Sequence, residues 1–304
     1  MIHAVLSFDV DAESPVLADS ARHARDLGAM SHQAYGPREG VLRILALLAE
    51  YSLPATFFVP GWTADRWPQA VEQILAAGHE IGHHSYAHVS PIDQSEDEER
   101  RDFERALAAL GKHGVRPDGF RCPSWEPTVR TPALVAEHGF AYDSSLFDSS
   151  RPYLLETQAG DVVELPVSWA LDDWQQYAFL PRVSRNTIES PAKVLDLWVA
   201  ELEAARRHDT LFMLTCHPFL SGRPRRVETL RALIEQALAV GDVEFAEARE
   251  VARMAHRIGQ HRRLRVDVER QDGLNHGARP SARSASSSHA TLAAASAVCC
   301  PGPS

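Results

Sequence analysis

Two kinds of hydrophobic pattern alternate along the chain as far as residue 256. Short apolar runs predict strands at residues 4–8, 55–59, 80–82, 119–121, 140–142, 162–166 and 211–216. Longer stretches of helical periodicity predict helices at residues 39–50, 68–77, 95–111, 131–138, 191–208, 225–240 and 246–256. This alternation is typical of parallel strands joined by crossover helices, so we predict an α/β fold, either an open sheet or a barrel.

Turn and cap residues support several of these boundaries. Pro37 precedes the first predicted helix as a start signal, and Gly78 follows the second as a terminator. Ser95 and Glu98 have the spacing of a capping box at the start of the third. The polar residues of interest follow the predicted strands, and the chemistry of a (β/α) barrel lies at the carboxyl ends of its strands.

The composition changes near residue 258, where a basic stretch is followed by a run rich in Ser and Ala. That run lacks the periodicity needed to pack against a core. We therefore predict one catalytic domain over residues 1–257 and a disordered tail over residues 258–304.

Charge and cysteine content narrow the class of protein. The formal net charge of −10 argues against a nucleic-acid binder. The four cysteines form no C-x-x-C pair, which argues against a cysteine zinc cluster. Neither a signal peptide nor a membrane-spanning apolar run is recognisable, so we expect a cytoplasmic protein without a membrane partner.

Two carboxylates follow the first predicted strand, at Asp9 and Asp11. Residues two apart in a strand point the same way, so both side chains can converge on one site. One of them could bind a metal while the other acts as a base. A solvated acidic turn is the alternative that this pattern alone leaves open.

Four histidines lie within ten residues, beginning with His79 and His83. Together with Glu80, these two match the H-E-x-x-H pattern of zinc proteases, which requires a helix. Gly82 lies inside the pattern, and glycine disfavours a helix there.

The second metal hypothesis uses the other two histidines, His84 and His88. Together with Asp11 they would supply three protein ligands and leave positions open for water and substrate, which is typical of a catalytic metal site. Histidines that merely form hydrogen bonds in the core remain the alternative.

Two further segments carry candidate chemistry. Arg121 ends a predicted strand and is followed by Pro123 and Trp125 in a loop stiffened by proline. The planar guanidinium can hold a carboxylate through two hydrogen bonds, although a surface arginine beside a packing tryptophan would look the same. His217 directly follows the strand predicted at 211–216, where it could act as a general acid.

Taken in order, these segments resemble the polysaccharide deacetylase family, the NodB-homology fold of carbohydrate esterase family 4. Its first motif places a base aspartate and a metal aspartate after the first strand, which Asp9 and Asp11 match. Its second motif, H-[ST]-x-x-H, is matched from His84 to His88. Val10 separates the two aspartates, whereas the commonest first motif has them adjacent.

The remaining motifs extend the resemblance to roughly residues 3–256. The third, R-x-P-x followed by an aromatic residue or Gly, is matched by Arg121, Pro123 and Trp125. The last, a strand end of the Leu-x-x-His type, is matched by Leu214 and His217. Four motifs in the correct order make the resemblance specific.

The resemblance implies a distorted (β/α) barrel of the NodB-homology type, with parallel strands and outer helices. It also implies a divalent metal, most often Zn²⁺, with Co²⁺, Ni²⁺ and Fe²⁺ as alternatives. The implied roles are a catalytic base (Asp9), three metal ligands (Asp11, His84, His88), a catalytic acid (His217) and an arginine that fixes the base (Arg121). To the substrate-binding set we assign Pro123, Trp125, Trp169 and Tyr86.

The amino-acid sequences at residues 8–13, 165–169 and 216–219 resemble those of an intracellular branch of the family. That branch includes peptidoglycan deacetylase-like proteins and relatives of cyclic imide hydrolases. We therefore expect a hydrolase of non-peptide C–N bonds that removes N-acetyl groups from an amino sugar or opens a cyclic imide. The alternatives are a metal-independent allantoinase-like ureide hydrolase and a non-catalytic metal-binding barrel. The expected partner is a small-molecule or amino-sugar substrate, and self-association into a homo-oligomer is compatible with the sequence.

Overall fold

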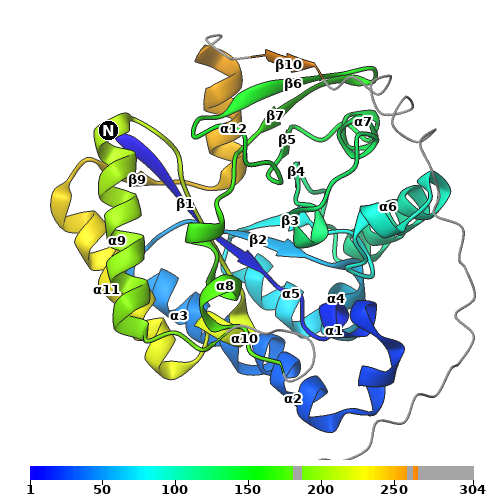
Figure 1. Ribbon diagram of the computed structural model, residues 1–304, viewed down its shortest axis with the longest axis horizontal. Coiled ribbons are helices and arrows are strands. Elements are labelled where there is room, and N and C mark those ends of the chain that lie inside the picture. Colours follow the sequence, from blue (N-terminus) through cyan, green and yellow to red (C-terminus); the bar gives the residue numbers. More distant parts are fainter. Residues whose placement is uncertain (181–186, 259–262, 266–304) are drawn as a thin grey trace, which may run out of the picture. The chain divides into compact units, whose positions relative to one another are not determined.

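The predicted strands form the centre of the protein (Figure 1), whose computed structural model describes residues 1–180, 187–258 and 263–265. One sheet contains all ten described strands. They are β1 (Ile2–Asp9), β2 (Thr56–Val59), β3 (Glu80–His83), β4 (Gly119–Phe120), β5 (Tyr142–Asp143), β6 (Tyr153–Thr157), β7 (Gly160–Glu164), β8 (Phe212–Cys216), β9 (Val243–Phe245) and β10 (Arg263–Arg265).

The strand order is β10-β6-β7-β5-β4-β3-β2-β1-β8, with β9 also paired to β1. Every described pair of strands runs parallel except the hairpin of β6 and β7. The predicted parallel α/β fold is therefore confirmed. Of the two strands of the hairpin, β7 was predicted and β6 was not.

Helices connect the parallel strands, and the seven predicted helices are present with boundaries that differ by at most two residues. The α-helices are α1 (Ser14–Asp19), α2 (Leu27–Tyr35), α3 (Val41–Tyr51), α4 (Gly61–Arg66), α5 (Pro68–Ala76), α6 (Glu96–Gly111), α7 (Thr131–Glu137), α8 (Asp173–Tyr177), α9 (Pro191–His208), α10 (Pro218–Ser221), α11 (Pro224–Val240) and α12 (Ala248–Ile258). Short 3₁₀ or π segments are η1 (Ala21–Arg25), η2 (Gly36–Gly40), η3 (Pro91–Asp93), η4 (Pro123–Trp125) and η5 (Trp169–Leu171). The capping box of Ser95 and Glu98 starts α6 as predicted.

Side chains of β1 alternate between the two faces of the sheet. Ala4, Leu6 and Phe8 pack in the cluster that also contains residues of α3, α9 and α11, the helices that lie beside β1 in Figure 1. Val5 packs in a second cluster with residues of β2, β5, β7, β8 and α12. The period of two therefore points Ser7 and Asp9 in the same direction as Val5, toward the inner face of the sheet.

The sheet is strongly curved around that inner face. Arg121, directly after β4, donates hydrogen bonds to Ser7 and Asp9 on β1 at 2.9 and 2.8 Å. In a flat sheet β4 and β1, three strands apart in the order, would be separated by roughly 14 Å, beyond the reach of one side chain. Curvature brings them together, as the predicted distorted barrel requires. Within the described residues no strand pairing joins β8 to β10, so the sheet is open there.

The predicted tail falls mostly outside the described residues. Within 258–304 the structure describes Ile258 at the end of α12 and Arg263–Arg265, which pair in parallel with β6. The disordered tail and the boundary at residue 257 stay predictions. No helix in the described part of the chain is long and apolar enough to cross a bilayer.

Candidate active site

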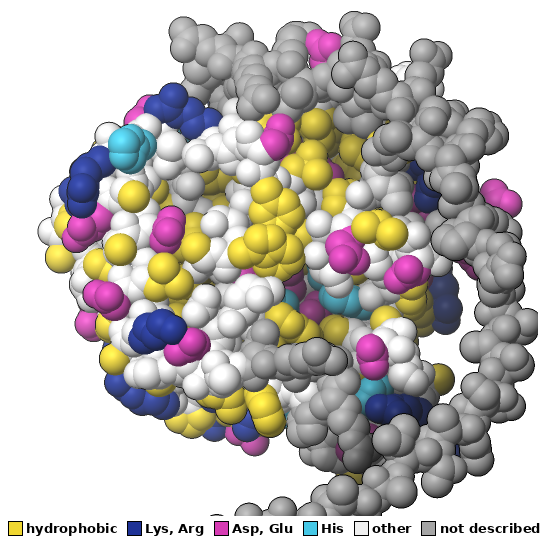
Figure 2. All heavy atoms as spheres, in the orientation of Figure 1, with side chains coloured by type: hydrophobic (Ala, Val, Ile, Leu, Met, Phe, Trp, Pro, Cys, Tyr) yellow, Lys and Arg dark blue, Asp and Glu magenta, His cyan; other side chains and the backbone are white. Residues whose placement is uncertain are grey.

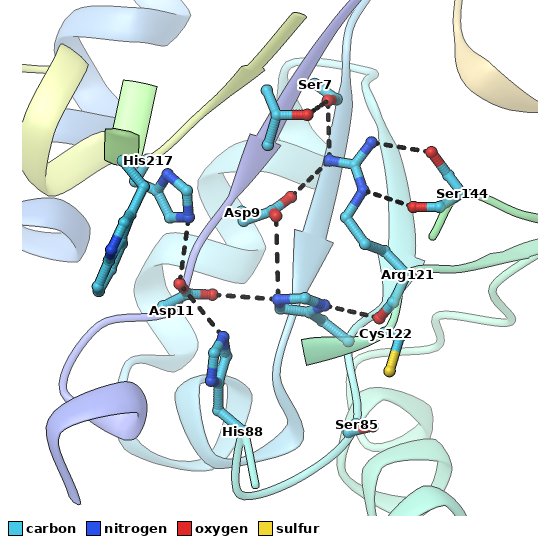
Figure 3. Close-up of polar contacts among 12 residues, drawn as sticks. Ser7, Asp9, Asp11, Ser85, His88, Arg121, Cys122, Ser144 and His217 are labelled. Atoms are coloured by element: carbon cyan, nitrogen blue, oxygen red, sulfur yellow. Dashed lines mark hydrogen bonds and ion pairs between the residues drawn. The ribbon is translucent and has the colours of Figure 1, made fainter. Parts of the chain in front are cut away.

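Asp11, His84 and His88 come together beyond the carboxyl ends of β1 and β3. Figure 3 shows Asp11 and His88 pointing toward one another. The Asp11 Oδ1 atom lies 3.4 Å from His84 Nε2, and Asp11 Oδ2 lies 3.5 Å from His88 Nε2. One potential ligand atom from each residue lies within 4.8 Å of those from the other two. The three residues assigned as ligands from the sequence thus form one cluster.

The chemistry of this cluster fits a divalent cation. Both carboxylate oxygens of Asp11 are buried and accept no hydrogen bond from any described residue. A buried carboxylate without partners is costly unless a cation or a donor satisfies it. Although burial raises the pKa of Asp11, the facing His88, His84 and His217 lower it well below its ordinary value, so the carboxylate is ionised. Two imidazoles and one carboxylate suit Zn²⁺ and its neighbours in the first transition row.

The alternation of side chains along β3 and the residue after it determines which histidines can be ligands of a cation. His84 follows β3 and points inward, where its Nδ1 lies 2.7 Å from the backbone carbonyl oxygen of Arg121, leaving Nε2 toward Asp11. His83 points to the other face and packs on Phe103, and burial lowers its pKa to about 3. Because Glu80–His83 are strand β3, the helix required by the zinc-protease pattern is absent, and that hypothesis is wrong.

Asp9 lies beside the cluster and is held by Arg121. Its Oδ1 accepts a hydrogen bond from Nη1 of the fully buried arginine at 2.8 Å, and its Oδ2 lies 3.9 Å from His84 Nε2. The guanidinium also donates to the backbone oxygen and hydroxyl of Ser144, at 3.2 and 3.1 Å. Asp9 is therefore fixed at the edge of the cavity with one oxygen directed toward the histidines (Figure 3).

His217, directly after β8, faces the cluster from the other side. Its Nε2 lies 3.5 Å from Asp11 Oδ2. Its Nδ1 lies 2.7 Å from Oδ1 of Asp173, which also accepts a hydrogen bond from the backbone N–H of His217. Burial lowers the pKa of His217, but Asp173, Asp11 and Asp172 together raise it, to about 10. The imidazole therefore carries a proton at neutral pH.

The sequence analysis did not assign Asp172 and Asp173. Asp173 is fully buried, and also accepts a hydrogen bond from the Ser221 hydroxyl. Asp172 lines the cavity, and burial is the main cause that raises its pKa to about 7. The one available signal was the adjacent pair of carboxylates at 172–173 in an otherwise apolar segment, which gave no hint of contact with a residue more than forty positions away.

A cavity of about 420 Å³ opens above these residues. Asp9, Asp11, His84, His88 and His217 form part of its wall. Three tryptophans complete it: Trp125, Trp169 and Trp174. The cavity thus joins every candidate catalytic and ligand side chain except Arg121, which lies buried behind Asp9.

Two residues of the predicted substrate-binding set do not line the cavity. The Tyr86 ring lies below the guanidinium of Arg105, and its hydroxyl hydrogen-bonds Asp65 and Arg105, so this side chain belongs to the helical layer around α4 and α6. Pro123 is buried at the start of η4. Its fixed φ helps to present Trp125 rather than to touch a substrate. Tyr86 was assigned to the substrate because it lies within the histidine motif, but its side chain does not line the cavity.

Backbone strain is concentrated around the site. Seven described residues other than glycine have a positive φ, and five of them lie in the loops that carry the site: Ala12, Ser85, His88, Ser124 and Trp125. Such conformations cost energy and persist where surrounding contacts hold them, which is common at functional sites. Here the strain turns His88 and Trp125 toward the cavity.

Comparison with known proteins finds similar sequences and similar folds. The family model described as polysaccharide deacetylase matches residues 34–142. A peptidoglycan deacetylase of Helicobacter pylori is 29% identical over 252 residues, which cover 73% of this chain and 86% of that protein. A solved structure from Mycobacterium smegmatis, described as a candidate polysaccharide deacetylase, is 49% identical with a TM-score of 0.84 and covers 86% of this chain and 93% of that one.

A third similar structure, PuuE allantoinase, is 24% identical with a TM-score of 0.73 over 86% of this chain and 92% of that one, and it shows the shared fold alone. The fold is of the NodB type, and the similar proteins support a deacetylase-type hydrolase that acts on C–N bonds. The chain belongs to the polysaccharide deacetylase family. The family resemblance and the fold class inferred from the sequence are confirmed.

Proposed function

We propose that this protein is a divalent-metal-dependent amide hydrolase that removes N-acetyl groups from an amino-sugar substrate. The observation that carries the proposal is the unpartnered Asp11 carboxylate facing two imidazoles, with Asp9 and His217 on the same cavity. Asp11, His84 and His88 would hold the cation. When bound, the cation acts as a Lewis acid toward the amide carbonyl and makes water more acidic.

Asp9 acts as the base in this proposal. One of its oxygens is occupied by the buried Arg121, and the other remains free to accept a proton from the attacking water. The guanidinium fixes the carboxylate in place through this hydrogen bond. Removal of the Arg121 guanidinium would leave Asp9 without this partner and free to turn away from the cavity.

His217 acts as the acid that protonates the departing nitrogen. The contact with Asp173 fixes the ring so that Nδ1 faces that carboxylate and Nε2 faces the cavity. A proton on Nε2 is therefore available to the amine as the C–N bond breaks. The balanced reaction converts amide and water into an amine and a carboxylate.

Metal content and activity measured side by side test the proposal. Wild type, His88→Ala and His79→Ala would be assayed on an N-acetylated amino sugar, succinimide and allantoin. His79 is half-buried, lies outside the cavity and serves as the matched control. We expect wild type and His79→Ala to carry about one transition metal per chain and to release acetate, and His88→Ala to lose both properties.

Other outcomes favour the alternatives. Activity that survives chelation, with allantoin as the preferred substrate, would support a metal-independent ureide hydrolase. Metal binding without turnover of any substrate would support a non-catalytic metal-binding barrel. Preferential opening of succinimide would replace the deacetylase with a cyclic imidase. Zn²⁺ as the native metal, a cytoplasmic location and a homo-oligomeric state remain predictions from the sequence.

A further inference from the structure

We propose that the mouth of the active-site cavity selects amides that carry a primary ammonium group close to the scissile bond. The inference rests on the proposed deacetylase function and adds the charge of its substrate. It follows from the side chains around the mouth, which combine exposed carboxylates with exposed aromatic rings.

Three carboxylates line the outer part of the cavity: Asp19, Asp93 and Glu126. They come from three separate segments, the end of α1, η3 and the residue after η4, and all three are exposed. Neither Lys nor Arg occurs among the described residues that line this cavity. Asp19 Oδ2 lies 3.1 Å from His23 Nε2, whereas Asp93 and Glu126 have no ion-pair partner in the described part of the chain.

The inner charges of the site are already compensated. Arg121 neutralises Asp9, and Asp173 neutralises His217. Asp11 faces His84 and His88 and, in the proposed enzyme, the cation. Asp93 and Glu126 are therefore an excess of negative charge at the mouth that attracts cations to the cavity and repels anions.

An aromatic wall stands beside these carboxylates. Trp125 and Trp169 have ring centroids 4.7 Å apart, and Phe147 stacks on Trp169 at 5.0 Å. Trp169 and Phe147 are 46% and 41% exposed, which is unusual for such large apolar side chains. Figure 2 shows hydrophobic side chains gathered beside a hollow in which acidic and histidine side chains are visible.

Carboxylates and aromatic faces together favour an ammonium group. The carboxylates supply charge, and an indole face attracts a cation through its quadrupole while also stacking on an apolar ring face. Hydrolysis of an N-acetyl group releases the substrate's nitrogen as an amine, which becomes another ammonium. Both reactions create a carboxylate, but deacetylation releases it as acetate, whereas opening of an imide or ureide ring keeps it on the same product molecule.

Matched substrates test this selectivity. One series is chitobiose with one acetamide and one free amine, its neutral diacetyl form, and a form whose free amine is succinylated. A second pair, monoacetylated 1,4-diaminobutane and N-butylacetamide, distinguishes an alkyl amine from an amino sugar. We expect kcat/KM of wild type to be about tenfold higher for a cationic substrate than for its neutral match, lowest for the anionic form, and less selective at 0.5 M salt.

The Asp93→Asn/Glu126→Gln variant should reduce the preference for the cationic substrate to within about threefold. Glu72→Gln/Glu250→Gln, on exposed faces of α5 and α12 outside the cavity, changes the net charge equally and should keep the preference. Equal cleavage of cationic and neutral substrates, or an unchanged preference in the Asp93/Glu126 variant, overturns the selectivity while the deacetylase stands. Failure to cleave any acetamide overturns both.

Discussion

The Oδ1 atom of Asp173 lies 2.7 Å from Nδ1 of His217, and the same carboxylate accepts the backbone N–H of His217. One buried side chain thus fixes both the ring and the main chain of the proposed acid. The ring nitrogen that remains is directed to the cavity.

Asp173→Asn should lower kcat about 100-fold while metal content and KM change little, since the ring loses its negative partner but the cavity is kept. Because Asp173 raises the pKa of His217, its removal should also shift the alkaline limb of the kcat–pH profile to lower pH. Steady-state kinetics over pH 6–10 measure both effects. Ser221→Ala, which removes only a hydroxyl donor to Asp173, is the milder control. An unshifted profile in Asp173→Asn would remove this residue from the mechanism.

Arg121→Lys should be far more damaging than its charge suggests. The guanidinium contacts Ser7, Asp9 and Ser144 at the same time, and a single ammonium cannot match that planar set. We expect kcat/KM to fall about 100-fold and the free energy of unfolding to fall by about 2 kcal/mol. Chemical denaturation and kinetics measure these changes. Ser144→Ala, which leaves the bond to Asp9 intact, should show much less loss of activity, and equal losses would argue against the role of Arg121 at Asp9.

Gly40→Ala tests how remote packing positions His217. A Cβ at Gly40 would overlap the backbone carbonyl oxygen of Pro218, the residue after the proposed acid, and Gly222 packs on the same spot. We expect a tenfold or larger loss of kcat, by the misplacement argument for catalytic groups, with metal content retained. Gly111→Ala, a helical glycine with open space around its Cβ, is the control and should stabilise the protein by about 0.5–1 kcal/mol. Full activity in Gly40→Ala would show that α10 can shift without moving His217.

Asp143 should make stability depend on pH. Burial raises its pKa to about 6, against partial compensation by Ser145, Ser144 and Arg121, and the facing Glu164 is buried as well. Because the folded-state pKa is raised, the stability associated with protonated Asp143 is present below about pH 4 and lost as pH rises to about 6. The loss is of the order of 3 kcal/mol.

Asp143→Asn cannot ionise and should lack this loss. Denaturant melts of wild type and variant from pH 4 to pH 7 should therefore converge at the acid end and separate toward pH 7, with the variant gaining relative stability. Curves that stay parallel across this range would mean that Asp143 keeps its ordinary pKa in the folded protein.

Local sequence determined most of the secondary structure and the residues of the site. Apolar periodicity predicted the helices because each of them buries one face, and it predicted β1, β2 and β8 because both faces of these strands are covered. Asp9, Asp11, His84, His88 and His217 were recognisable because each follows a strand that ends at the same edge of the sheet. The hydrogen bond from Ser95 to Glu98 was recognisable because the two residues are only three positions apart.

Tertiary structure alone decided which residues meet across the curved sheet. Asp173 contacts His217 across 44 positions, a separation at which no local pattern carries information. Arg121 reaches Asp9 across 112 positions, and this contact was expected only from the family resemblance. Tyr86, inside the histidine motif, was misplaced because the loop after β3 turns through positive φ at Ser85 and directs the next side chain to the helices. The sequence therefore determined the chemical groups and the strands that carry them. The curvature of the sheet determined which side chains meet across it. That curvature results from many small packing contacts between distant segments, so no single segment encodes it.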